Sequence, residues 1–157
     1  MKLKEMPAME ADDNYIKWEP KLEIGIPVID AQHKKLVELC NSFYQTLTQR
    51  NAVGNTAWEQ PLTDALRECA EYVQTHFKDE ETLMKACNYP AFLEHKKVHD
   101  SFIKKIIETS SSFQNATTAT AFKFVKFLYE WVLSHIAHED KLYVKYVLDY
   151  YKQRKQL

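Results

Sequence analysis

The 157-residue chain has few residues that interrupt helices and few that cross-link small folds. It contains only two glycines and five prolines, which favours long helices over many short strands. Its three cysteines, Cys40, Cys69 and Cys87, include no C-x-x-C pair, which argues against a disulfide framework and is compatible with a reducing compartment. Cys40 and Cys69 lie on apolar helical stripes, and we interpret them as small core residues.

A large charge imbalance and long apolar runs are also missing. The 21 Lys and Arg residues nearly balance the 22 Asp and Glu residues, for a net charge of -1, so no nucleic-acid or membrane-surface partner is expected. No apolar run approaches the roughly 18–20 residues that cross a bilayer. Charged residues throughout the first 18 positions leave no apolar core for a signal peptide. We therefore expect a cytoplasmic protein.

Apolar residues recur instead at alternating steps of three and four, which predicts amphipathic helices that bury one stripe each. The expected helices span about residues 30–49, 57–86, 91–112 and 117–138. Four amphipathic helices joined by short connections bury their stripes best in an antiparallel up-down-up-down bundle. The sequence therefore predicts an all-α fold with a four-helix bundle.

The two ends of the chain are expected to extend this bundle. Residues 1–28 show little periodicity and predict an extended N-terminal arm, whose segment 18–27 could pack apolar side chains across helix ends. Asp30 is the predicted N-cap of the first helix. Residues 140–153 predict a continued helix or a short fifth one. With no internal repeat, residues 1–157 are interpreted as a single domain.

Seven polar residues are expected to point into the bundle with the apolar stripes. They are His33, His76, Glu80, His95, His99, His135 and Asp140. An unpaired buried imidazole is costly, so we interpret the set as a metal centre rather than as separately satisfied core histidines. Residues four apart lie one turn apart on one helix face, so the pairs His76/Glu80 and His95/His99 can each reach one ion.

The number and type of these donors narrow the choice of metal. A mononuclear structural zinc site needs four ligands, and seven are too many. The H-E-x-x-H pattern is absent, because Phe77 follows His76 and Lys96 follows His95. Ferritin-like enzymes combine Glu residues with Glu-x-x-His pairs, whereas this chain has more histidines than carboxylates. Imidazoles mixed with two carboxylates favour a pair of iron ions over zinc, manganese or copper.

Five motifs between residues 18 and 143 resemble those of the bacterial hemerythrins. They are Trp18…Gly25-Ile…Ile29-Asp30-x-Gln32-His33-Lys-Lys-Leu36, His76-Phe77-x-x-Glu80-Glu81-x-x-Met84, Tyr89-Pro90, His95-x3-His99 and Trp131-x3-His135-Ile136-x-x-Glu139-Asp140. The resemblance implies two iron ions joined by an oxo or hydroxo bridge.

The resemblance also implies a role for each donor. It places His95, His99 and His135 on one iron and His33 and His76 on the other. Glu80 and Asp140 would bridge the two ions. The count of ligands then leaves one open position on the two-histidine iron, where O2 would bind reversibly.

The spacing around His135 does not decide whether Glu139 or Asp140 is the second carboxylate donor. Glu139 repeats the spacing of four found in His76/Glu80, whereas Asp140 would lie about 140° away from His135 on a regular helix. The resemblance points to Asp140, which implies that the helix ends or loosens near residues 137–139. We expect His138 to be exposed and not a ligand, Glu81 to face solvent, and Gln32 to lie behind a ligand.

Apolar residues next to the donors are candidates for the wall of an O2 pocket, with ordinary bundle core as the alternative. They are Leu36, Phe77, Trp131, Val132 and Ile136. The favoured function is non-enzymatic O2 binding for carriage, storage or scavenging, with an unidentified O2-receiving protein as a candidate partner. A di-iron oxidase, peroxidase or nitric-oxide-handling enzyme, a sensor of O2, redox state or iron, and a metal-free interaction bundle remain the alternatives.

Overall fold

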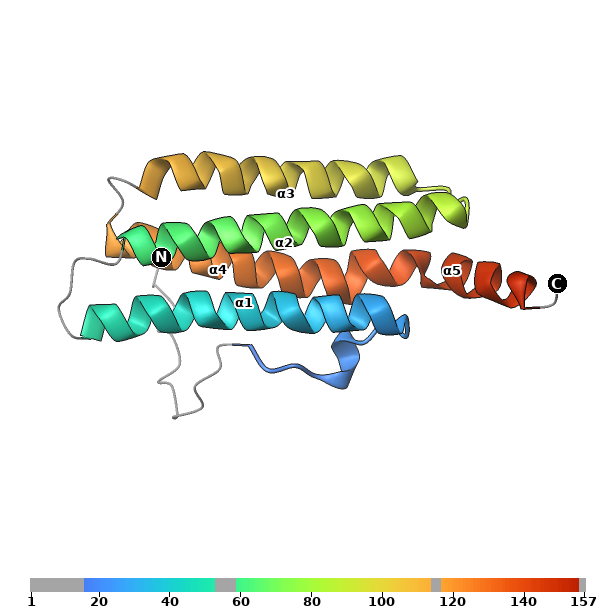
Figure 1. Cartoon of the computed structure of the whole chain (residues 1–157), viewed down its shortest axis with the longest axis horizontal. Coiled ribbons are helices and arrows are strands. Elements are labelled where there is room, and N and C mark those ends of the chain that lie inside the picture. The colour runs from blue at the N-terminus through green and yellow to red at the C-terminus, as the bar shows by residue number, and fades with distance from the viewer. Residues whose placement is uncertain (1–15, 53–58, 114–116, 156–157) are drawn as a thin grey trace, which may run out of the picture.

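The computed structural model describes residues 16–52, 59–113 and 117–155, which form helices running back and forth along one bundle (Figure 1). The elements are a 3-10 turn Pro20–Leu22, α1 Pro27–Ala52, α2 Glu59–Ala86, α3 Phe92–Ser112, α4 Thr118–Ser134, a π-helical turn His135–Glu139 and α5 Asp140–Arg154. α1 packs against α2 and α4, and α2 packs against α3. The predicted all-α up-down-up-down bundle with a C-terminal fifth helix is confirmed, and the described residues contain no strand.

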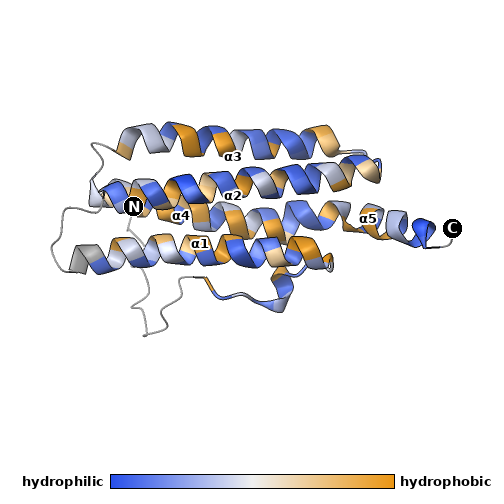
Figure 2. Ribbon diagram, in the orientation of Figure 1, coloured by the Kyte–Doolittle hydropathy of each residue, from blue (hydrophilic) through white to orange (hydrophobic). Residues whose placement is uncertain are grey.

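The predicted inward-facing stripes form the core. Hydrophobic and hydrophilic residues alternate along α1 and α2 (Figure 2). The buried residues of both helices follow the expected steps of three and four. The two helices are antiparallel, so His33 lies opposite His76, with ring centroids 4.9 Å apart. Two turns further along, Cys40 and Cys69 are both buried in the larger apolar cluster. Burial raises the pKa of the Cys69 thiol to about 12 and also raises that of Cys40, which fits core residues rather than reactive ones.

A second, smaller apolar cluster closes the other end of the bundle. Its buried residues are Ile24, Ile26, Ile29, Met84, Tyr89, Tyr143 and Val147. Ile24 and Ile26 come from the N-terminal arm, and Leu22 of the same arm packs into the larger cluster. The arm therefore packs across helix ends as expected over its described part. Residues 1–15 of the expected arm lie outside the described residues.

The prediction that Asp30 is an N-cap is wrong. α1 already begins at Pro27, because proline at the first helical position has a suitable φ and leaves no N–H unpaired. Asp30 lies in the first turn, where its carboxylate accepts hydrogen bonds from the backbone N–H groups of Ile24 at 2.8 Å and Gly25 at 3.0 Å. Gly25 has a φ of 83°, a left-handed conformation that glycine adopts without a steric cost. Asp30 thus holds the arm against the start of α1.

The π-helical turn explains how His135 and Asp140, which are five residues apart, can both point into the bundle. The backbone N–H of Asp140 donates to the carbonyl oxygen of His135, five residues earlier. In this geometry five residues complete about one turn, so His135 and Asp140 point to the same side of the helix. The predicted loosening near residues 137–139 is confirmed. α4, the π-helical turn and α5 follow one another in the chain with no loop between them (Figure 1).

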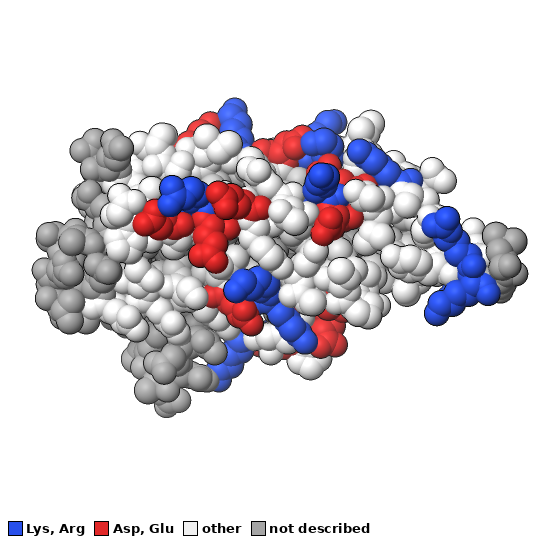
Figure 3. Space-filling view, in the orientation of Figure 1, with Lys and Arg blue, Asp and Glu red and all other residues white. Residues whose placement is uncertain are grey.

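The outer faces of the helices carry charges of both signs (Figure 3). Several form pairs one turn apart, such as Lys96 with Asp100 at 2.6 Å and Lys126 with Glu130 at 3.6 Å. Such exposed pairs contribute about 1 kcal/mol or less each. Over the part of the chain that the structure describes, no helix is both long and apolar enough to cross a lipid bilayer.

Deleting the exposed residue His138 should convert the π-helical turn into a regular helix. Five residues of the π-helical turn and four residues of a regular helix both complete about one turn, so Tyr143 and Val147 should stay in the second cluster and the unfolding free energy should not fall. Deleting the exposed residue Lys145 from the regular part of α5 is the contrasting variant, because it turns the following residues by about 100° and moves Val147 out of the second cluster. Burial of a large apolar side chain is worth about 1.5–3 kcal/mol, so this variant should lose about that much. Chemical denaturation measures both values; a loss in the His138 deletion as large as that in the Lys145 deletion would contradict this prediction.

Candidate metal centre

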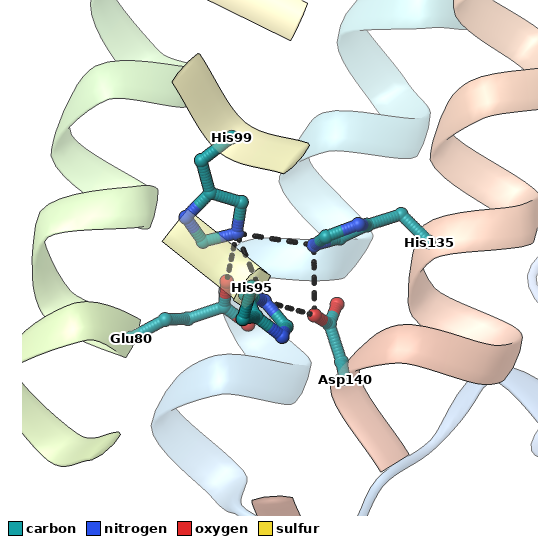
Figure 4. Close-up of side chains that lie close together, drawn as sticks. All are labelled: Glu80, His95, His99, His135 and Asp140. Carbon is teal, nitrogen blue, oxygen red and sulfur yellow. Dashed lines mark hydrogen bonds and ion pairs between the residues drawn. The ribbon is translucent and has the colours of Figure 1, made fainter. Parts of the chain in front are cut away.

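All seven predicted donor side chains meet in the middle of the bundle. They come from α1, from α2, from α3, from the start of the π-helical turn and from the start of α5, and each is at most 3% exposed. Figure 4 shows five of them around one point, with side chains directed toward one another. The helical stripes bring six of them inward, and the π-helical turn brings Asp140.

The donors form two groups that share both carboxylates. One group contains His95, His99 and His135, and the other contains His33 and His76. Glu80 and Asp140 belong to both groups. Within each group the donor atoms all lie within 4.8 Å of one another. This division is the same as the one that the resemblance implied.

Asp140 directs one oxygen to each group. Its Oδ1 lies 2.9 Å from Nε2 of His135 and 3.3 Å from Nε2 of His95. Its Oδ2 lies 3.1 Å from Nε2 of His33. The carboxylate therefore spans the space between the two groups.

Glu80 lies between the groups in a less symmetric way. Its Oε2 is 3.3 Å from Nε2 of His99 and 3.5 Å from Nε2 of His76, so one oxygen faces both groups. Its Oε1 is 3.5 Å from Nε2 of His33 and accepts a hydrogen bond of 2.6 Å from the hydroxyl of Tyr143. The tyrosine thus holds one oxygen while the other remains directed at the centre.

The three-histidine group has the spacing of ligands around an ion. Nε2 of His99 lies 3.1 Å from Nε2 of His95 and 3.1 Å from Nε2 of His135 (Figure 4). Two nitrogens bound at about 2.1 Å to one metal are about 3.0 Å apart at right angles and about 3.4 Å apart in a tetrahedron. The observed separations of 3.1 Å are compatible with nitrogens that share one ion.

Several buried polar atoms of the described centre have no hydrogen-bond partner. They are Nδ1 and Nε2 of His33, Oε2 of Glu80, Nδ1 of His135 and both carboxylate oxygens of Asp140. A buried polar atom without a partner costs about 1–3 kcal/mol, and more when it is charged. The donor set therefore fits a bound cation, which would satisfy the inward-facing atoms together.

Burial and mutual charge shift the pKa values in the centre in opposite directions. Burial lowers the pKa of His76 to about 4. Burial also lowers the pKa of His33, but its contacts with Asp140 and Glu80 outweigh this and raise it to about 9. Burial and the charge of Asp140 raise the pKa of Glu80, yet the nearby histidines bring it down to about 2. The carboxylate is therefore anionic at neutral pH and attracts cations.

The residues that contact the donor side chains were only partly predicted from the sequence. Gln32 contacts a donor as expected, with Oε1 2.8 Å from Nδ1 of His76. The expectation that Glu81 faces solvent is wrong: its side chain is 17% exposed, and Oε1 lies 3.2 Å from Nδ1 of His99 because α3 packs beside it. Tyr143 was missed, although it follows Asp140 by three residues on the buried stripe of α5.

The five apolar residues predicted beside the donors pack as expected of core. Leu36, Phe77, Val132 and Ile136 are buried in the larger cluster, and Trp131 is half-buried against it. Phe77 stacks on His99 with centroids 3.6 Å apart, and Trp131 stacks on His135 at 4.3 Å. These aromatic rings cover the faces of two donor histidines.

Comparison with known proteins places the chain in a family. The family model for the hemerythrin HHE cation binding domain matches residues 24–147. Bacteriohemerythrins of Stenotrophomonas maltophilia and Pseudomonas aeruginosa are 36% and 31% identical over 132 and 130 residues, which cover 83% of this chain and 80% of each relative. A crystal structure of wild-type hemerythrin superposes with a TM-score of 0.72 at 25% identity and covers 85% of this chain and 98% of that one. The chain, with its buried cluster of histidines and carboxylates that could hold metal, belongs to the hemerythrin family.

Proposed function

We propose that this protein binds O2 reversibly at a pair of iron ions, for oxygen carriage, storage or scavenging, and that it is not an enzyme. One observation carries the proposal: the seven donors divide into a three-histidine and a two-histidine group that share two carboxylates. Family membership supports it. The three free cysteines fit the cytoplasmic location expected from the sequence.

The division of donors supports an unequal pair of ions. We assign His95, His99 and His135 to one iron and His33 and His76 to the other, with Glu80 and Asp140 as bridges. The second group has one histidine fewer, so an open position for O2 is expected on that side. When bound, the iron pair would supply the electrons that O2 needs to bind.

The residues around the donors favour binding without further reaction. Reversible O2 binding requires that water and external proton donors stay away from the centre. Phe77 and Trp131 cover histidine rings on the three-histidine side. Leu36 lies one turn from His33 on α1 and is buried, so it is a candidate wall residue on the two-histidine side.

Binding of ferrous iron at pH 7 should release a proton from His33. Without metal its pKa is about 9, so the ring is protonated at pH 7, whereas a metal ligand must be neutral. The release from His33 should disappear as the pH rises through about 9. His76, with a pKa of about 4, should release none at pH 7. Anaerobic calorimetry in buffers of different ionisation enthalpy measures the protons released; a release that stays constant from pH 7 to 10 would contradict this assignment.

Replacing Asp140 should remove metal, whereas replacing its neighbour should not. Asp140→Asn keeps the shape but removes the charge and one of the two acceptor oxygens between the groups, so we expect fewer than two irons per chain. Glu139→Gln is the matched control and should retain both irons. Elemental analysis after anaerobic loading measures the ratio. Loss of iron in the Glu139 variant with retention in the Asp140 variant would overturn the assignment.

Optical spectra provide the direct test of function. The reduced, iron-loaded protein should gain charge-transfer absorption in air and lose it again on degassing. We expect this cycle to repeat without loss of amplitude, because the apolar surroundings protect the bound state.

Two other outcomes would contradict the proposal. Rapid irreversible oxidation in the same experiment would favour a di-iron enzyme or a sensor. One zinc ion per chain in the purified protein would exclude the two-iron centre.

A further inference from the structure

Three consecutive acidic residues on α2, namely Asp79, Glu80 and Glu81, are directed to three different places. Successive residues on a helix point about 100° apart, so Asp79 and Glu81 lie on the two flanks of Glu80. α2 packs against α1 and against α3. Asp79 contacts a residue of α1, and Glu81 contacts a residue of α3. Glu81 therefore reaches a histidine of one donor group directly, whereas Asp79 reaches a histidine of the other group only through Gln32.

Glu81 contacts the three-histidine group directly. Its Oε1 lies 3.2 Å from Nδ1 of His99. A carboxylate can only accept a hydrogen bond, so Nδ1 carries the proton and Nε2 keeps its lone pair. That lone pair is directed at the nitrogens of His95 and His135. Glu81 thereby selects the ring form of His99 that can bind a metal through Nε2.

The position of Glu81 keeps the cost of this contact low. The residue lines a surface pocket of about 280 Å³ between α2 and α3, together with Lys78, His99 and Asp100. Its side chain is 17% exposed and borders this pocket, so it is not fully removed from solvent while it contacts the ring. A carboxylate that remains partly hydrated avoids most of the penalty for burying a charge.

Asp79 acts on the two-histidine group through an intermediate residue. The Nε2 of Gln32 donates to Oδ2 of Asp79 at 2.7 Å, which orients the amide. The Oε1 of Gln32 then faces Nδ1 of His76 at 2.8 Å and can only accept. His76 therefore also carries its proton on Nδ1 and keeps the Nε2 lone pair for the centre.

We propose that Asp79, acting through Gln32, and Glu81 are positioning residues that hold His76 and His99 in their metal-binding forms, and that Glu81 also lowers the reduction potential of the centre. A charged partner makes an imidazole a stronger donor, which favours the more highly charged ion. His99 has such a partner in direct contact, whereas the neutral amide of Gln32 separates His76 from the charge of Asp79. This inference rests on the proposed iron centre.

Two substitutions at Glu81 separate its two roles. Glu81→Gln keeps an acceptor oxygen but removes the charge, whereas Glu81→Leu removes both. Glu71→Gln is the matched control, because it neutralises an exposed carboxylate on α2 about 15 Å away along the helix. Anaerobic competition with a chelator measures the affinity for ferrous iron, and a redox titration of the loaded full-length chain measures the midpoint potential.

We expect Glu81→Leu to lower iron affinity by about 10–100-fold, the usual effect of losing such a partner. Glu81→Gln should keep an affinity near that of the native chain and shift the midpoint potential upward. The control should change neither quantity. Native-like affinity in Glu81→Leu would overturn the positioning role, and a potential in Glu81→Gln equal to that of the control would overturn the effect of charge.

The positioning role of Asp79 is tested by the same measurement of iron affinity. Asp79→Leu frees the amide of Gln32 to rotate and should weaken iron binding, whereas Asp79→Asn still offers a carbonyl to Gln32 and should restore it. Equal affinities of the native chain and Asp79→Leu would overturn this half of the inference.

The native chain separates failure of this inference from failure of the proposed function. If it does not take up two irons, both fail. If it takes up two irons and binds O2 reversibly while all Asp79 and Glu81 variants behave like the control, only the positioning roles fail.

Discussion

Five imidazoles and two carboxylates share a space from which water is excluded, and the rest of the structure depends on how their charge is compensated. Their contacts with one another leave Oε2 of Glu80 and both oxygens of Asp140 without a hydrogen-bond partner. Bringing such groups together costs free energy that the helices must supply through apolar packing. The larger cluster on one side of the centre and the second cluster on the other provide that packing. A bound cation would turn the same unsatisfied atoms into a source of stability.

The bundle brings the donors together through one regular feature and one irregular feature. The regular feature is the antiparallel packing of α1 and α2, which sets His33 opposite His76 without any distortion of either helix. The irregular feature is the π-helical turn, which adds one residue between His135 and Asp140. Such turns are rare and locally unfavourable. Here α5 compensates, because Tyr143 and Val147 follow Asp140 into the second cluster.

Much of the fold and of the centre could be predicted from residue spacing. Six of the seven donors keep the helical spacing, so their burial followed from the apolar stripes that they share. Asp140 could not be placed that way, because a regular helix would have turned it away from His135; only the resemblance to a family pointed to it. Asp30 was assigned to the wrong position because the stripe shows where a helix is buried, whereas Pro27 decides where it begins.

The sequence alone determined the helices, the sides on which they are buried and six of the seven candidate donors, because these follow from interactions between residues three and four apart. Residue spacing alone left open how the donors divide into two groups, and only the tertiary structure decided which carboxylate oxygen faces each group. It also decided that Glu81 contacts His99 rather than solvent. These features depend on the rotation and offset of one helix against another. Differences of about one ångström in that packing change which polar atoms can meet, and no local pattern in the chain records them.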